Sequence, residues 1–538
     1  MTTGADIIAG KLHAAGCRHA FGIPGGEVLA LMQALDEAGL KFVLVKHENA
    51  GGFMAEGGWH ADGAPGVLLA TLGPGAANAV NVVANAWQDR VPLIFLTGCV
   101  DQAEAESYTH QVFDHQQLLR PIVKASFSAR LGALDVMMEK ALAIALDGQP
   151  GPVHIDVPIR VAEAETTETW NRTFQSTPVA PSAAAGTDLE TALKLFAKAE
   201  RPIAIAGVDA VNENASAEIT EFCENYRIPL VTSYKGKGLL DENSQLALGG
   251  AGLSPKADGH LLPLINKSDC ILLLGYDPIE MRVNWRNPWE ENAPVIDVTP
   301  VLRTHGMHSV TATLRSAVKP VLDYLRVVRK RAQTSWPDGE PQKVRADLDA
   351  AFAPEISGWG PGTIFHTLRA VMPADTVATA DSGAHRILAS QIWRCPGPRQ
   401  MLQSSALCTM GCAVPLAIGH RLVEGQAPVI AFVGDAGLEM CLGELSTLRD
   451  LKIPVIICVL VDTSLALIEL KQRGSQRPNV GVDFGETDFP AVARAYGGHG
   501  VWIDDTATLR SEAEDALRRD GFTVLACRIE RRAYDGAF

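Results

Sequence analysis

Two short apolar segments in the C-terminal third of the chain each end in an aspartate. The segments 428–434 and 453–461 are rich in Val and Ile, and Asp435 and Asp462 follow them directly. Runs of this kind are typical of strands buried on both faces of a parallel sheet, and 439–451 between them is predicted to be the crossover helix. Such a unit brings the carboxyl ends of neighbouring strands to one sheet edge, where open α/β sheets bind ligands.

The two carboxylates at that edge form a candidate metal site. Mg²⁺ typically takes one or two carboxylates together with phosphate oxygens, and the carbonyl of Ser464 is a candidate third ligand. The small residues of Gly434-Asp-Ala-Gly437 let backbone N–H groups approach a phosphate at the start of a helix. Taken alone, these four residues fit an ordinary turn equally well. The aspartate at the next strand end favours a metal-bound diphosphate.

The rest of the chain repeats the alternation of strands and helices. With 538 residues the chain is too long for one core. We predict domains at 1–165, 187–330 and 361–535, with linkers near 166–186 and 330–360. The other strand candidates are 42–45, 66–71, 93–97, 153–157, 202–206, 229–232, 270–274 and 295–298. This alternation predicts an α/β fold with three doubly wound parallel sheets.

Composition excludes several other classes of protein. The net charge of −15 and the absence of a basic stripe argue against nucleic-acid binding. The ten cysteines contain no C-x-x-C pair, so buried reduced thiols in a cytoplasmic protein are expected. The N-terminus has no basic start before an apolar core, so no secretion signal is predicted. No apolar run approaches the roughly 20 residues needed to span a bilayer, so no membrane association is expected.

Further candidate residues lie in the N-terminal block. Glu48 follows the strand candidate 42–45 and precedes a helix rich in small residues. It is either a solvated helix N-terminal charge or a partly buried carboxylate that shares a proton with a nitrogen heterocycle. Two Gly-Pro loops, 21–26 and 71–78, lie beside strands. Neither matches a P-loop or a Rossmann dinucleotide fingerprint, so by themselves they fit structural turns.

Together these motifs resemble the thiamine diphosphate enzymes that act on 2-oxo acids, along nearly the whole chain. The best match is to the catabolic, flavin-independent acetolactate synthases. The segments that carry the resemblance are Thr109-His-Gln111 with Asp114, Arg120-Pro-Ile-Val-Lys124, Gly275-Tyr-Asp-Pro-Ile-Glu280, Thr409-Met-Gly411, Val461-Asp462 and Gly481-Val-Asp-Phe-Gly485. Many other members of the family carry Asn at the second metal position, so Asp462 helps to distinguish the catabolic acetolactate synthases from them.

The resemblance implies a division of labour between the domains. The N-terminal domain binds the pyrimidine ring of the cofactor, and the C-terminal domain binds its diphosphate through Mg²⁺. The positions that it assigns to cofactor binding are Glu48, Thr71, Asn78, Ala384, His385, Cys408, Met410, Gly434, Asp435, Ala436, Gly437, Asp462, Ser464 and Leu465. Asp435, Asp462 and Ser464 hold the metal. Met410 separates the two cofactor rings, although it also fits an ordinary core methionine, and His385 equally fits a structural histidine.

The resemblance also assigns catalytic and substrate positions. The catalytic positions are Glu48, which contacts the aminopyrimidine ring, and His110, Gln111, Gly25 and Gly26, which lie near the reacting carbonyl. Leu467, Ile468 and Lys471 shape the substrate pocket. Lys471 departs from the family pattern and fits either a pocket cation for a larger anionic donor or a solvated lid residue. Ala436 stands where Gly is usual.

The function that the resemblance implies is the condensation of two pyruvates to 2-acetolactate and CO₂. The alternatives are a decarboxylase or carboligase for another 2-oxo acid, and a non-catalytic homologue that kept the fold. FAD stays open as a further cofactor but is not favoured, because Tyr276-Asp-Pro278 matches the flavin-free group. The cofactor halves come from two subunits in the family, so we expect a homodimer at least, and a homotetramer.

Overall fold

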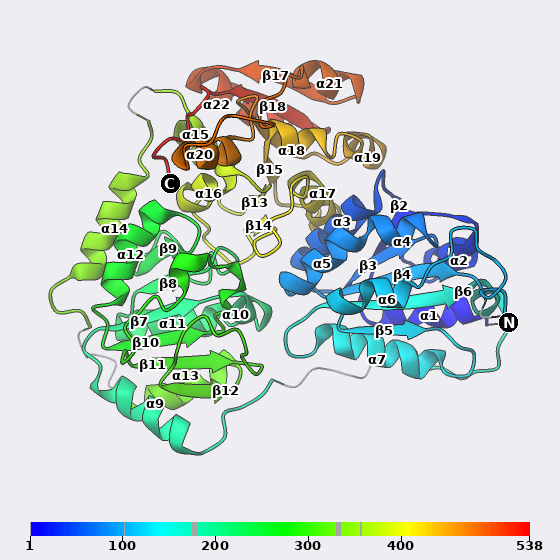
Figure 1. Ribbon diagram of the computed structural model, residues 1–538, viewed down its shortest axis with the longest axis horizontal. Coiled ribbons are helices and arrows are strands. Elements are labelled where there is room, and N and C mark those ends of the chain that lie inside the picture. The colour runs from blue at the N-terminus through cyan, green and yellow to red at the C-terminus, as the bar shows by residue number, and fades with distance from the viewer. Residues whose placement is uncertain (1, 102, 175–179, 330–334, 356–357) are drawn as a thin grey trace.

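The computed structural model describes the chain apart from residues 1, 102, 175–179, 330–334 and 356–357. Three six-stranded sheets, all with parallel pairing, organise this described part of the chain. We call the parts built on these sheets the N-terminal, central and C-terminal units. In Figure 1 they lie at the right, lower left and top of the molecule. Helices pack around each sheet, which confirms the predicted doubly wound α/β architecture; the domain boundaries stay a prediction.

The N-terminal unit holds the first sheet, in the order β2-β1-β3-β4-β6-β5. Its strands are β1 His19–Ile23, β2 Lys41–Leu44, β3 Gly66–Ala70, β4 Leu93–Cys99, β5 Ala125–Ser128 and β6 Pro152–Pro158. Its helices are α1 Gly4–Ala14, α2 Leu29–Glu37, α3 Glu48–Asp62, α4 Pro74–Asn78, α5 Val80–Gln88, α6 His115–Leu119, α7 Leu134–Leu146 and α8 Ile159–Glu163. Strand β3 is buried along its whole length, as its apolar run predicts.

The central unit holds the second sheet, in the order β12-β11-β10-β7-β8-β9. Its strands are β7 Pro202–Ala206, β8 Leu230–Thr232, β9 Ala247–Gly250, β10 Cys270–Leu274, β11 Val295–Thr299 and β12 Ala312–Arg315. Its helices are α9 Thr187–Lys198, α10 Val208–Asn212, α11 Ser216–Tyr226, α12 Pro255–Ile265 and α13 Val318–Val328. Counted in its own chain order this is 3-2-1-4-5-6, the order of dinucleotide-binding sheets, whose strand order reverses between β7 and β10.

The C-terminal unit repeats the topology of the N-terminal unit, with the order β14-β13-β15-β16-β18-β17. Its strands are β13 Val377–Ala380, β14 Met401–Gln403, β15 Val429–Gly434, β16 Ile456–Val461, β17 His499–Ile503 and β18 Thr523–Arg528. Its helices are α15 Pro361–Val371, α16 Ala384–Ile392, α17 Ala413–Glu424, α18 Asp435–Glu439, α19 Glu444–Leu451, α20 Ala466–Gly474, α21 Phe489–Ala495 and α22 Thr506–Ala516. The two outer units therefore share one sheet design.

Helices α3 and α17 join the N-terminal and C-terminal units at a close glycine contact. A Cβ at Gly57 would lie 2.3 Å from the carbonyl oxygen of Leu416, and one at Gly419 would lie 1.9 Å from that of Met54. Glycine lowers helix propensity by up to about 1 kcal/mol per residue. Here it lets two backbones touch, so packing between units overrides propensity. Helix α3 still begins at Glu48 and ends at Asp62, and Gly63 follows it in the left-handed conformation.

One predicted segment is wrong in detail, and one predicted linker contains a helix. The single crossover helix 439–451 is divided into α18 and α19, because turns at 440–443 separate them and the Glu444 side chain accepts a hydrogen bond from the Lys46 backbone N–H. The predicted linker 330–360 contains a further helix, α14 Glu340–Ala351, whose Arg345 donates to backbone carbonyls of the central unit. In the described part of the linker 166–186, which excludes 175–179, no helix or strand forms.

Candidate active site

The carboxyl ends of β15 and β16 open into a cavity in the C-terminal unit. The strands pair in parallel with Gly434 opposite Leu460, so Asp435 and Asp462 follow at the same sheet edge. The cavity volume is about 260 Å³. Its lining residues are Ser382, Gly383, Ala384, His385, Cys408, Met410, Gly434, Asp435, Ala436, Gly437, Leu460, Asp462, Ser464, Leu465, Ala466, Leu467, Ile468 and Tyr534. Every cofactor position predicted in the C-terminal third lines it.

The two aspartates are buried and share one hydrogen-bond network. Asp435 Oδ2 accepts from the backbone N–H groups of Asp462 and Thr463 at 3.1 and 2.7 Å, and its Oδ1 accepts from Ala436 at 2.8 Å. Burial raises the pKa of Asp435. Burial and the neighbouring Asp435 charge raise the pKa of Asp462 to about 7. A divalent cation removes this repulsion, so the donor set fits Mg²⁺.

The loop after β16 is held in a defined conformation. Thr463 adopts a positive φ of 55°, which costs free energy for a β-branched residue and marks a constrained turn. The Ser464 hydroxyl donates to Asp483 at 2.9 Å, and the Leu465 N–H donates to the Val482 carbonyl at 2.8 Å. These contacts fix the backbone beside Asp462, as a metal or phosphate site requires.

His385, the second residue of α16, presents an unpartnered polar atom in this cavity. Its side chain is buried, and Nε2 has no hydrogen-bond partner. Burial lowers the pKa of His385 to about 3, so its imidazole is neutral. A Cβ at Gly434 would lie 3.4 Å from the ring, which leaves the ring little spare room. Because buried polar groups rarely lack partners, this nitrogen fits a hydrogen bond to a ligand.

Asp381, which the sequence analysis did not single out, ties two walls of the cavity together. Its carboxylate accepts hydrogen bonds from the N–H groups of Gly411 and Cys412, both at 2.9 Å. A Cβ at Gly437 would lie 2.0 Å from Asp381 Oδ2. Gly437 thus has to be glycine for this carboxylate to reach the turn beside Met410. Asp381 follows β13 as Asp435 and Asp462 follow their strands, which is the signal that could have found it.

The N-terminal candidates gather around the loop 71–78 after β3. Glu48 is 4% exposed, so it is not a solvated helix charge. Its Oε2 accepts a hydrogen bond from Asn78 Nδ2 at 3.0 Å. At the other end of the loop the Thr71 hydroxyl donates to Glu27 Oε2 at 2.7 Å. Glu27 was not predicted, although it directly follows the predicted glycine pair.

Of the remaining predicted N-terminal positions, Gly25 and Gln111 lie against the same loop. A Cβ at Gly25 would meet a side-chain oxygen at 2.2 Å, whereas Gly26 faces open space. Gln111 has a positive φ of 60°, and a Cβ at Gly73 would lie 2.5 Å from the Gln111 carbonyl oxygen. His110 is exposed on the preceding segment. The structure thus brings Gly25 and Gln111 to the loop 71–78.

The two halves of the predicted site are not brought together within this chain. The residues that line the cavity with Asp435 and Asp462 all lie between 382 and 534. Glu48 instead makes its hydrogen bond within the N-terminal unit. Leu467 and Ile468 line the cavity as predicted, whereas Lys471 is exposed and does not line it.

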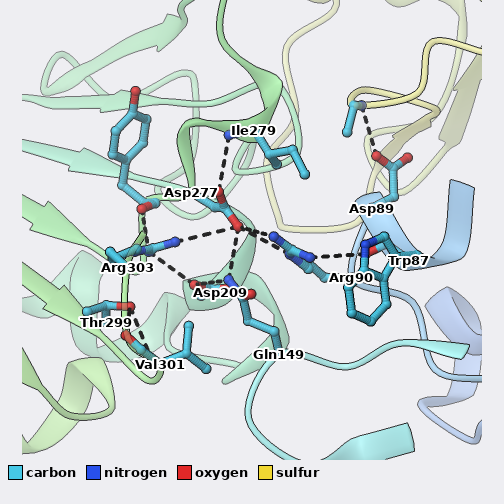
Figure 2. A network of polar contacts seen from close by, with 12 residues as sticks. Trp87, Asp89, Arg90, Gln149, Asp209, Asp277, Ile279, Thr299, Val301 and Arg303 are labelled. Carbon is cyan, nitrogen blue, oxygen red and sulfur yellow. Dashed lines mark hydrogen bonds and ion pairs between the residues drawn. The ribbon is translucent and has the colours of Figure 1, made fainter. Parts of the chain in front are cut away.

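A network of charged side chains occupies the carboxyl ends of β7 and β10 in the central unit (Figure 2). Asp277 Oδ2 accepts hydrogen bonds from Arg90 at 2.9 Å and from Gln149 at 2.9 Å, and both donors come from the N-terminal unit. Asp209 accepts from Arg303 at 3.2 Å and from Gln149 at 3.1 Å. These side chains therefore bond one another at the point where the strand order reverses, which is where such sheets bind dinucleotides.

The charges of this network compensate one another. Burial opposes ionisation of Asp277, but Arg303 and Arg90 hold its pKa below the usual value. Burial raises the pKa of Asp209 to about 6. The network is a buried contact between the central and N-terminal units.

No helix in the described part of the chain is long and apolar enough to cross a membrane.

Three family models match the chain in the order of its three units. They are the thiamine pyrophosphate enzyme N-terminal TPP binding domain at 2–118, the central domain at 189–325 and the C-terminal TPP binding domain at 381–527. The chain belongs to the thiamine pyrophosphate enzymes. The matched ranges contain Glu48 in the N-terminal model and both Asp435 and Asp462 in the C-terminal model.

Within this class the chain is similar to acetolactate synthases. It is 27% identical to the acetolactate synthase large subunit of Buchnera aphidicola subsp. Schizaphis graminum, over 96% of this chain and 92% of the relative. It is 27% identical to the acetolactate synthase isozyme 3 large subunit of Escherichia coli K12, over 96% and 93%. It is 27% identical to the acetolactate synthase of Bacillus subtilis 168, over 97% and 92%.

Proposed function

We propose that the protein is an acetolactate synthase, which condenses two pyruvates to 2-acetolactate and releases CO₂. Relatives with that name align with nearly the whole chain. The observation that carries the proposal is the buried pair of Asp435 and Asp462 in the C-terminal cavity. In a chain that also holds a buried Glu48, this pair provides the groups that a thiamine diphosphate enzyme needs.

Thiamine diphosphate and Mg²⁺ fit the chemistry of this cavity. Asp435, Asp462 and the Ser464 carbonyl would hold the metal, which in turn would hold the diphosphate. The unpartnered nitrogen of His385 is available to a phosphate oxygen. The small residues Gly434, Ala436 and Gly437, and the backbone of Ala384 and Leu465, leave room for backbone contacts. Bound thiamine diphosphate supplies an electron sink for the decarboxylation of a 2-oxo acid.

Each remaining site residue has a proposed task. Glu48 would exchange a proton with the aminopyrimidine ring of a bound cofactor, a role that suits a carboxylate removed from water. Thr71 and Asn78 hold the loop beside that ring. The Cys408 carbonyl and the Met410 N–H would bond the ring from the C-terminal unit, and the Met410 side chain would lie beside the cofactor rings.

The substrate is proposed to bind between the two units. Gln111 and His110 donate hydrogen bonds to the carboxylate or carbonyl oxygen of pyruvate, where negative charge develops. The backbone of Gly25 and Gly26 faces the same place. Leu467 and Ile468 provide an apolar wall for the methyl group, and Lys471 belongs to an exposed lid.

The proposed assembly is a homodimer at least, and a homotetramer by the family pattern. Glu48 and the Asp435–Asp462 pair face different surroundings in one chain, so a second chain is needed to supply the missing half. Symmetric pairing of two identical chains would complete two such sites at once.

The proposed cofactor set contains no flavin. The inference rests on the carboxyl ends of β7 and β10, where Asp277, Asp209 and their arginine partners already bond one another (Figure 2). Absence of a flavin band near 450 nm in the purified protein would agree with this inference.

We also propose a cytoplasmic location. All ten cysteines are free in the structure, and most are buried. Reduced buried thiols are usual in a reducing compartment. Fractionation of cells that express the protein would test this location.

The test is an assay of acetolactate formation from pyruvate with thiamine diphosphate and Mg²⁺ supplied. We expect acetolactate at millimolar pyruvate, and a loss of at least about 100-fold in Glu48→Gln, which removes the proton-accepting carboxylate. Cofactor binding by Glu48→Gln, followed by circular dichroism, serves as the control for folding. If another 2-oxo acid releases CO₂ while pyruvate yields no acetolactate, the reaction class stands and the substrate assignment is wrong.

A further inference from the structure

A buried histidine outside the cofactor cavity contacts the loop that carries the N-terminal site residues. His115, the first residue of α6, is 4% exposed. Its Nε2 accepts a hydrogen bond from the Gly73 backbone N–H at 3.1 Å. Because a backbone N–H can only donate, Nε2 carries no proton and Nδ1 must carry it. Nδ1 then donates to Asp156 Oδ1 at 2.8 Å.

Asp156 is itself held by neighbouring strands. The Thr97 hydroxyl donates to Asp156 Oδ1 at 2.7 Å. The oxygen of the same Thr97 hydroxyl accepts a hydrogen bond from His154 Nε2 at 2.8 Å. His154 Nδ1 in turn accepts from the Ser126 hydroxyl at 2.7 Å. Potential ligand atoms of His115, His154 and Asp156 lie within 4.8 Å of one another. Every imidazole nitrogen is already used in this chain of hydrogen bonds, so the cluster fixes a tautomer and does not fit a metal site.

Gly73 needs such an anchor because its backbone conformation is unusual. Its φ and ψ are 68° and −106°, a region that side-chain-bearing residues rarely adopt. A Cβ there would lie 2.5 Å from the carbonyl oxygen of Gln111, which has a positive φ of its own. Two backbone segments with positive φ therefore face each other at Gly73 and Gln111. His115 bonds the first and lies four residues after the second.

The loop 71–78 connects the Gly73 contact with both proposed N-terminal catalytic groups, Glu48 and Gln111. Its far end reaches Glu48 through Asn78, and a Cβ at Gly75 would lie 3.3 Å from Glu48 Oε1. Its near end lies against Gln111. A shift of Gly73 would therefore move both the proton-exchanging carboxylate and the substrate-binding amide. Misplacement of catalytic groups by about 1 Å can cost about 100-fold in rate.

We propose that His115, with its tautomer set by Asp156, is a positioning residue that holds the loop 71–78 and Gln111 in register for catalysis. This inference rests on the proposed function for the roles of Glu48 and Gln111. The structural part of the inference, an acceptor that secures the Gly73 amide, is independent of the substrate.

Two substitutions separate the contacts of His115. Gln reaches the Nε2 position and keeps an acceptor for the Gly73 N–H, whereas Asn ends one bond short and keeps only the contact to Asp156. We expect His115→Asn to speed hydrogen exchange of the Gly73 amide at least 10-fold in the cofactor-free protein. We expect His115→Gln to stay within about 3-fold of the wild type. Pro74 has no amide proton, so the Gly73 signal is separated from the next exchanging site in mass spectrometry.

Steady-state kinetics with pyruvate provide the second readout. We expect kcat to fall at least 10-fold in His115→Asn with KM changed less than 3-fold, and His115→Gln to recover most of kcat. His366→Asn is the matched control, because His366 Nε2 in α15 bonds the carbonyl of Phe352 at the end of α14, at 2.8 Å. It should lower the melting temperature to a similar extent but leave Gly73 exchange and kcat near wild-type values.

The possible outcomes distinguish this inference from the proposed function. Equal effects of Asn and Gln at position 115, or unchanged Gly73 exchange in His115→Asn, would overturn the inference. If the wild type makes no acetolactate while Gly73 exchange follows the expected order, the proposed reaction fails and the anchoring role of His115 stands.

Discussion

Lys235 is a buried cation that joins all three units, and its removal has a predictable dependence on pH. Its side chain is 7% exposed, and Nζ lies 3.0 Å from Asp89 and 3.7 Å from Glu56, both in the N-terminal unit. Asp89 also accepts hydrogen bonds from the N–H groups of Ser405 and Ala406 in the C-terminal unit, at 3.1 and 2.9 Å. Lys235 thus stabilises the segment that leads to Met410.

We expect Lys235→Met to destabilise the protein more at pH 8 than at pH 5.5. Loss of one partner from a buried ion pair costs about 3–5 kcal/mol. Burial raises the pKa of Glu56 to about 7 in the wild type. At pH 5.5 Glu56 is therefore protonated and Lys235 pairs with Asp89 alone, whereas at pH 8 Glu56 is ionised and both pairs are lost. At one pH unit above this pKa, the variant should lose about 1.4 kcal/mol more of its free energy of unfolding, relative to the wild type, than at pH 5.5.

The sign follows from proton linkage. Without Lys235, the folded-state pKa of Glu56 rises further above its unfolded value, so the folded variant binds more protons than the unfolded chain. The stability of the variant consequently decreases as the pH rises through this range.

Urea denaturation followed by tryptophan fluorescence at both pH values measures the difference. Lys319→Met is the control, because Lys319 forms an exposed pair with Asp323 at 3.0 Å that is worth about 1 kcal/mol or less. A difference between wild type and Lys235→Met that stays constant or shrinks from pH 5.5 to pH 8 would refute the reasoning.

Three further predictions concern the cofactor sites. Asp435→Asn should weaken thiamine diphosphate binding in the presence of Mg²⁺ at least 10-fold, or about 1.4 kcal/mol, in a fluorescence titration; unchanged affinity would contradict the metal assignment. Gly437→Ala should displace the Asp381 carboxylate and lower stability by about 1–3 kcal/mol through overpacking, whereas Gly26→Ala, with open space around it, should change stability by less than about 1 kcal/mol. Protein supplied with FAD should retain no stoichiometric flavin after gel filtration; a bound flavin would contradict the proposed flavin-free cofactor set.

The sequence predicted the central strands well and the peripheral ones poorly, for a physical reason. Strands buried on both faces, such as β10 and β16, need continuous apolar runs, and those runs stand out. The edge strands β5 and β14 are short, and β5 is only half-buried, so their composition differs little from that of a loop. Each is placed by pairing with a single neighbouring strand, β6 or β13, and its own composition does not report that pairing.

The candidate site shows the same limit. Asp435 and Asp462 were recognisable because each ends a long apolar run, and their contact follows from parallel pairing. Asp381 also follows a strand directly, but that strand, β13, has only four residues, so the pattern was harder to recognise. The role of Gly437 depends on the approach of Asp381 across the sheet, and that of His115 on an unpredictable contact with Gly73. Contacts of this kind are set by tertiary structure, which local sequence patterns do not report.

The separation of Glu48 from the Asp435–Asp462 pair leads to a prediction about subunits in mixture. If each active site takes Glu48 from one chain and Asp435 from its partner, Glu48→Gln and Asp435→Asn are each inactive alone. A mixed dimer of the two variants then has one site with both residues intact and one site with neither. Random exchange of subunits makes half of the dimers mixed, so refolding equal amounts together should restore about a quarter of wild-type activity, as expected for a symmetric dimer. A site contained within one chain would give no recovery at all, and that result would refute the proposed assembly.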